Sequence, residues 1–80
     1  MILDNIKTAL RQEFQPELVE IIDESHLHAG HAGFGVYSHL LIKISAAPFA
    51  SLSRVERERK ARKAVLAILP DIHALRFEFV

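Results

Sequence analysis

The chain contains no cysteine, and only three of its 80 residues are glycine. The absence of cysteine excludes disulfide bonds, a cysteine nucleophile and a metal site built from this chain's own thiolates. No apolar run approaches the ~20 residues needed to cross a bilayer. Residues 1–14 carry an acid and an amphipathic period, unlike the basic, apolar start of a signal or transit peptide. We therefore expect a cytoplasmic protein without membrane contact.

Length and composition predict one compact domain over residues 1–80. Half of the residues are hydrophobic and 25% are charged, as in ordinary globular domains. The formal net charge is zero, but acids dominate residues 1–25 and cations dominate residues 54–63. A basic segment can bind nucleic acid, although a solvated helix face with internal ion pairs is the more common origin of such a run.

Apolar spacing, β-branched content and turn residues together predict six elements. They are a helix over residues 2–14, strands over 17–25 and 36–45, a helical turn within 46–53, a helix that follows Ser53 and ends at Pro70, and a strand over 72–80. Ser53 and Glu56 have the spacing of a capping box. Arg57 projects near the edge of the apolar stripe (Ala61, Ala64, Val65, Ile68 and Leu69), so we expect a structural role with a hydrogen-bond partner.

This order predicts an α+β domain, α-β-β-α-α-β, in which helices cover one face of a three-stranded sheet. The first two strands are expected to be antiparallel. A strand-helix-strand crossover would make the last two strands parallel if they are neighbours, so the sheet would be mixed.

Histidines gather in the segment "HLHAGHAGFG", residues 26–35, which contains His26, His28 and His31. This connection is longer than an ordinary hairpin loop, and extra length is often functional. A solvated loop is nevertheless the commoner explanation of such a pattern. A simple zinc or copper site formed by His28, His31 and His73 is one chemical alternative, because imidazole suits both metals.

Several motifs in fixed order carry a resemblance to a known family. They are "DESHLHAGHAG", Ser38-His39-Leu40 at a strand start, and "PFASLSRVERERKARKAVLAILPDIHALRFEF". Together they resemble the BolA family over nearly the whole chain. Leu40, Ser51 and Glu58 depart from the phenylalanine, glycine and histidine usual there. The resemblance implies a fold similar to a KH domain of the second topological type without its Gly-x-x-Gly loop.

The resemblance also implies a function, that of a non-enzymatic partner of monothiol glutaredoxins in iron-sulfur cluster trafficking or iron and redox regulation. The pair would share a [2Fe-2S] cluster with glutathione, and the isolated chain would bind none. The His-Ala-Leu match assigns one iron ligand to His73, and the Ser-x-x-His-Ala match assigns the other to His28, with His31 as the alternative. His39 is expected to be structural or to orient a ligand. Imidazoles can replace thiolates on one iron of such a cluster.

A nucleic-acid-binding transcriptional regulator of stress or morphology responses is the alternative function. It would use the basic helix 54–63, with Arg59, Lys60, Arg62 and Lys63 on phosphates. Against it, Glu56 to Lys60 and Glu58 to Arg62 are spaced as internal ion pairs, and no aromatic residue interleaves the cations. A weak homodimer is also compatible with the sequence. An enzyme is disfavoured, because no nucleophile and base occur at a recognisable spacing.

Overall fold

The computed structural model describes residues 1–25 and 39–80, and the predicted order of elements is confirmed. The elements are α1 (Ile2–Phe14), β1 (Leu18–Asp23), β2 (His39–Ser45), the 3-10 helix η2 (Ala47–Ser51), α2 (Arg54–Ile68) and β3 (Ala74–Phe79). The outer strands are shorter than predicted at both ends. Residues 36–38, the expected start of the second strand, and the histidines at 26, 28 and 31 lie outside the described residues.

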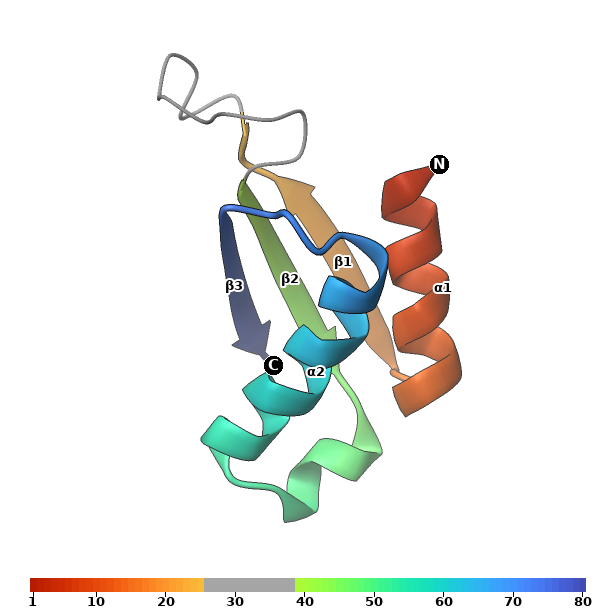
Figure 1. Cartoon of the computed structure of the whole chain (residues 1–80). Helices are drawn as coiled ribbons and strands as arrows, with labels where there is room; N and C mark the ends of the chain where they lie inside the picture. The colour runs from red at the N-terminus through yellow and green to blue at the C-terminus, as the bar shows by residue number, and fades with distance from the viewer. Residues whose placement is uncertain (26–38) are drawn as a thin grey trace.

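The three strands form one mixed sheet in the order β1-β2-β3. β1 and β2 are antiparallel with Ile21 opposite Ile42, and β2 and β3 are parallel with Ile42 opposite Phe77. Both helices lie against the same face of the sheet (Figure 1). The predicted α+β class and the mixed sheet are therefore confirmed. None of the helices in the part of the chain that the structure describes is long and apolar enough to cross a membrane.

The core lies between the helices and the covered face of the sheet. Its buried members are Ile6, Leu10 and Phe14 from α1, Leu40, Ile42 and Ile44 from β2, Phe49 from η2, Ala61 and Val65 from α2, and Leu75 and Phe77 from β3. Two adjacent isoleucines, Ile21 and Ile22, interrupt the alternation of apolar and polar residues in β1. They lie on opposite faces of the sheet. Ile21 packs against the core, whereas Ile22 is 37% exposed. On that opposite face Ile22 pairs with Leu41.

The ends of the helices follow the sequence signals. Pro16 disfavours the right-handed helical conformation for the residue before it, and Gln15 takes the left-handed conformation with φ 50°. At the start of α2, the Ser53 side chain accepts from the Glu56 N–H and the Glu56 carboxylate accepts from the Ser53 N–H, which confirms the capping box. Arg57 has the expected partner, because its Nε donates to the Leu52 carbonyl at 3.0 Å.

Candidate functional site

Three strand ends meet at one end of the sheet, where β1 stops and β2 and β3 begin. The backbone N–H of Glu24 donates to the His39 carbonyl at 2.9 Å, which extends the β1–β2 ladder by one bond. The His39 N–H donates to the Ser25 hydroxyl at 3.1 Å. Ser25 and His39 are both buried, at 4% and 9% exposure. At this end of the sheet the Ser25 side chain therefore bonds to the β2 backbone, beyond the last backbone hydrogen bond between β1 and β2.

Two imidazole rings lie together at this end. The ring centroids of His39 and His73 are 5.2 Å apart, and the rings are inclined at 61°. His39 is buried and His73 is exposed. Strict alternation would place the two side chains on opposite faces, since His73 shares its parity with Leu75. His73 precedes the first residue of β3, however, so the strand's alternation does not fix its direction.

A cross-strand ion pair flanks the histidines. One terminal nitrogen of Arg76 in β3 lies 3.0 and 3.1 Å from the two carboxylate oxygens of Glu24, just beyond β1. Asp23 fixes the same turn, because its carboxylate accepts from the Ser25 N–H at 2.9 Å. Sequence reasoning assigned no role to Glu24, Ser25 or Arg76. Their opposite charges on the first and third strands were the available signal for Glu24 and Arg76.

Imidazoles and carboxylates both lie at this end of the sheet. Within residues 1–25 and 39–80, no group of three or more histidine, aspartate or glutamate side chains is placed to hold a metal ion. The described part therefore offers the pair His39 and His73, of which His73 is accessible to a partner. Imidazole nitrogen is a suitable ligand for iron, zinc and copper, and one exposed imidazole could serve as a single ligand to a metal whose other ligands come from outside the described residues.

The four predicted cations of α2 divide into two groups. Arg59, Lys60 and Lys63 line a hollow of about 320 Å³ with Glu13 and Glu56. Arg62 instead faces β3, where a terminal nitrogen donates to the Leu75 carbonyl at 3.1 Å and the guanidinium lies 5.7 Å from the centre of the Phe77 ring. The same nitrogen is 3.4 Å from the Glu58 carboxylate, which confirms that expected pair.

The other expected pair, Glu56 with Lys60, is not among the ion pairs of the described residues. The Glu56 carboxylate is used by the capping box. The Ser53 N–H and the Ser53 hydroxyl both donate to it, and with smaller contributions from Lys60 and Arg59 they hold the pKa of Glu56 below its ordinary value of 4.5. In the described part of the chain Arg59, Lys60 and Lys63 are likewise without ion pairs.

Comparison with known proteins identifies the family of this chain. The family model described as BolA-like protein matches residues 10–80. The chain belongs to the BolA family. It is 37% identical over 76 residues to the DNA-binding transcriptional regulator BolA of Vibrio cholerae, a match that covers 94% of this chain and 70% of that protein. A Sinorhizobium protein described only as uncharacterized is 38% identical over 80 residues and is matched over 85% of its length.

The fold of the BolA family is also found by structural comparison. BolA1 from Arabidopsis thaliana superposes with a TM-score of 0.80 at 28% sequence identity, over 95% of this chain and 86% of that one. The match confirms the predicted resemblance to the family and the predicted architecture.

Proposed function

We propose that this BolA-family chain is a non-enzymatic partner of a monothiol glutaredoxin, and that the pair shares a [2Fe-2S] cluster in cluster trafficking or in iron and redox regulation. The glutaredoxin and glutathione supply thiolates, and this chain supplies imidazole nitrogen. A chain without cysteine depends on such a partner, because these clusters are usually held by thiolates.

The observation that carries the proposal is the exposed His73 beside the buried His39. An exposed imidazole at the end of a sheet can be reached by another protein. The contact with His39 limits the directions in which the His73 ring can point, as supporting groups around metal ligands commonly do. His73 is therefore assigned the ligand role and His39 the positioning role.

The proposed second ligand, His28 or His31, is connected through the chain to the same end of the sheet. These residues follow Ser25 by three and six positions. The Cα atoms of these two residues can lie at most about 11 and 22 Å from that of Ser25, because an extended chain spans no more than about 3.6 Å per residue. Ser25 is hydrogen-bonded to His39, whose ring contacts His73. Both candidates are thus tethered to the end of the sheet where His73 lies.

The test is reconstitution with a purified monothiol glutaredoxin, glutathione, iron and sulfide under anaerobic conditions. We expect visible absorption and circular dichroism spectra that differ from those of the glutaredoxin alone, and a one-to-one complex in size-exclusion chromatography with light scattering. A mixture whose spectra equal the sum of its separate components would refute the proposal.

Histidine variants locate the ligands. His73→Ala should abolish the changed spectrum, while His28→Ala or His31→Ala should weaken it. His26→Ala is the matched control, since it removes an imidazole from the same segment, and it should leave the spectrum unchanged. If His73→Ala behaves like His26→Ala, the assignment of His73 is wrong even when a complex forms.

A second function, DNA binding, is favoured by one observation. Arg59, Lys60 and Lys63 converge on one hollow and are without ion pairs in the described residues. The relative from Vibrio cholerae is named a DNA-binding transcriptional regulator. Arg62 contributes less to this surface, because it is bound to the Leu75 carbonyl.

Fluorescence anisotropy with duplex DNA over a salt series tests this alternative. Each phosphate contact adds about one unit to the slope of log K against log salt, so Lys60→Gln or Lys63→Gln should reduce the slope by about one. Lys43→Gln, on the opposite sheet face, is the control and should leave it unchanged. Absence of binding at low salt removes DNA from consideration.

A further inference from the structure

β3 is an outer strand of the sheet, and its outer side has no neighbouring strand. Figure 1 shows β3 at the margin of the molecule, with no other described element beyond it. The Val80 N–H donates to the Ile44 carbonyl at 3.1 Å, so the backbone of Val80 faces β2. Because backbone groups alternate in direction along a strand, those of Leu75, Phe77 and Phe79 point outward. We call the outward groups of these three residues the β3 edge.

Most of the β3 edge has no hydrogen-bond partner among the described residues. A terminal nitrogen of Arg62 donates to the Leu75 carbonyl at 3.1 Å. No other hydrogen bond joins the outward N–H and carbonyl groups to the described part of the chain. The Leu75 carbonyl itself has a second lone pair and can accept one more bond. A row of unpaired backbone groups of this kind is a template on which another strand can pair.

We propose that two copies of this chain associate through the β3 edge, in antiparallel pairing about a two-fold axis at Phe77. In this register Phe77 lies opposite Phe77 of the second copy, and Leu75 lies opposite Phe79 of that copy. Residues with outward backbone groups form hydrogen-bonded pairs, in which each pair exchanges both of its N–H···O bonds. The sheets of the two copies become one continuous sheet. The pairing does not depend on the proposed function.

Charges on the open face of the sheet favour this register. Arg76 and Glu78 are exposed and lie on either side of Phe77. The pairing places Arg76 of each copy opposite Glu78 of the other, in the non-hydrogen-bonded type of pair whose side chains lie closer together. An axis moved to Arg76 or to Glu78 places like charges opposite each other, which is destabilising. Registers centred further out pair fewer residues of β3.

The contacts that Arg76 and Glu78 make within their own chain are compatible with the pairing. One terminal nitrogen of Arg76 makes both bonds to Glu24, at 3.0 and 3.1 Å, which leaves its other nitrogens for a further carboxylate. The Glu78 carboxylate lies 4.0 Å from Lys43 Nζ. Across the two copies these four side chains form a row of alternating charge. Such networks stabilise more than isolated exposed ion pairs do.

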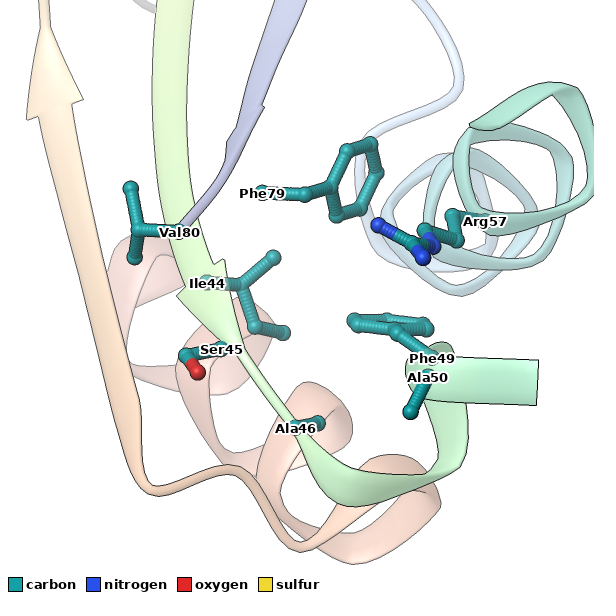
Figure 2. A pocket seen from close by; sticks show the side chains of 8 residues that line it. All are labelled: Ile44, Ser45, Ala46, Phe49, Ala50, Arg57, Phe79 and Val80. Atoms are coloured by element: carbon teal, nitrogen blue, oxygen red, sulfur yellow. The ribbon is translucent and has the colours of Figure 1, made fainter. Parts of the chain in front are cut away.

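Apolar residues complete the contact on both faces. Figure 2 shows the side chains of Phe79 and Val80 directed to opposite sides of β3, with Phe79 toward Arg57. Val80 is 64% exposed, and the pairing places it opposite Ala74 of the second copy. A contact along one strand of six residues is smaller than a standard interface of about 1,600 Å². The dimer is therefore weak, and its population depends on protein concentration.

Sedimentation velocity and amide hydrogen exchange by NMR test the proposal, from about 0.05 to about 1 mM protein, where a weak complex passes from dissociated to associated. The apparent mass should rise toward that of a dimer. Over the same range the exchange of the Phe77 and Phe79 amides with solvent should slow, because these N–H groups become hydrogen-bonded. A monomer at the highest concentration, or association that leaves both amides unchanged, would overturn the proposal.

Exchanging the charges tests the register. Arg76→Glu and Glu78→Arg each place like charges opposite each other, so each variant alone should dimerise at least about fivefold more weakly. An equimolar mixture of the two should associate more strongly than either variant alone, because the acids of one chain then lie opposite the arginines of the other. A mixture that associates no better than its components contradicts the register.

Glu17→Arg is the matched control. It makes the same change in charge at an exposed position just before β1, at the other edge of the sheet, and should dimerise as the unmodified chain does. Equal loss of dimer in Glu17→Arg and Glu78→Arg would show that net charge, and not pairing along β3, is responsible, and would overturn the proposal. If a β3 variant does not fold, the exchange of the Phe77 and Phe79 amides in the unmodified chain decides.

Discussion

At the scale of single residues, Gln15 ends α1 in a backbone conformation that costs free energy. Pro16 ends α1, and the Gln15 N–H still donates to the Arg11 carbonyl at 3.0 Å while the residue has φ 50° and ψ 55°. The left-handed conformation costs a residue with a side chain about 1–2 kcal/mol, and helices that end in this way usually use glycine. In the described part of the chain, Gln15 is the one residue other than glycine that has a positive φ.

We therefore expect Gln15→Gly to stabilise the domain by about 0.5–1 kcal/mol, because the gain in the folded state exceeds the entropy that glycine adds to the unfolded chain. The measurement is urea unfolding followed by circular dichroism. Gln12→Gly is the matched control, since it places glycine inside the same helix and should destabilise by about 1 kcal/mol. A loss of stability in Gln15→Gly comparable to that of Gln12→Gly would contradict this account.

Local chemistry explains which single-residue predictions succeeded. The capping box, the partner of Arg57 and the Glu58–Arg62 pair each depend on positions within five residues of one another. The contact of His39 with His73 and the ion pair of Glu24 with Arg76 join residues far apart in the sequence. Neither could be derived from spacing, because each depends on the strand register and on where β3 begins.

At the scale of elements, the start of α2 is stabilised by one ionised carboxylate. The Glu56 carboxylate accepts from the Ser53 N–H at 3.3 Å and from the Ser53 hydroxyl at 3.1 Å, and its pKa is lowered accordingly. A group whose pKa is lower in the folded state stabilises that state above its ordinary pKa, and this contribution is lost as the pH falls through the lowered value.

The stability of Glu56→Gln relative to the unmodified chain should therefore depend on pH. Glutamine keeps a hydrogen-bond acceptor at this position and does not titrate. We expect the advantage of glutamate in urea unfolding to be constant from pH 7 to about pH 5.5 and to shrink as the pH is lowered below the ordinary value of 4.5. A difference between the two proteins that stays the same down to pH 2.5 would show that the charge of Glu56 does not contribute.

The packing of α2 on the sheet explains why Arg62 differs from the other cations of that helix. A helical projection places Arg62 away from the apolar stripe with Arg59, Lys60 and Lys63. In the structure Arg62 reaches over Phe77 and binds the Leu75 carbonyl. A long side chain can cover apolar surface with its stem while its head finds a polar partner. Such a contact between helix and strand requires knowledge of how α2 crosses the sheet, which periodicity does not contain.

At the scale of the whole molecule, the topology follows from alternation and connection length. Period-two alternation predicted the second and third strands, and a short run rich in β-branched residues predicted the first. The helix that follows the capping box and ends before Pro70 predicted the crossover that makes β2 and β3 parallel. The family resemblance added the assignment of His73, which alternation alone would leave as a residue at the rim of the core. The resulting molecule has chemically different ends, with two imidazoles at one end and Arg57 near the contacting rings of Phe49 and Phe79 at the other.

The bond from the His39 N–H to the Ser25 hydroxyl, at 3.1 Å, has a consequence for tolerance to changes in chain length. Together with the bond between the Glu24 N–H and the His39 carbonyl, it joins the described residues that precede and follow positions 26–38. The free-energy cost of closing a longer segment between fixed points rises only slowly with its length. We therefore expect changes in the length of the segment between positions 25 and 39 to cost the domain little free energy, as long as the bonds that join Ser25 and Glu24 to His39 are kept.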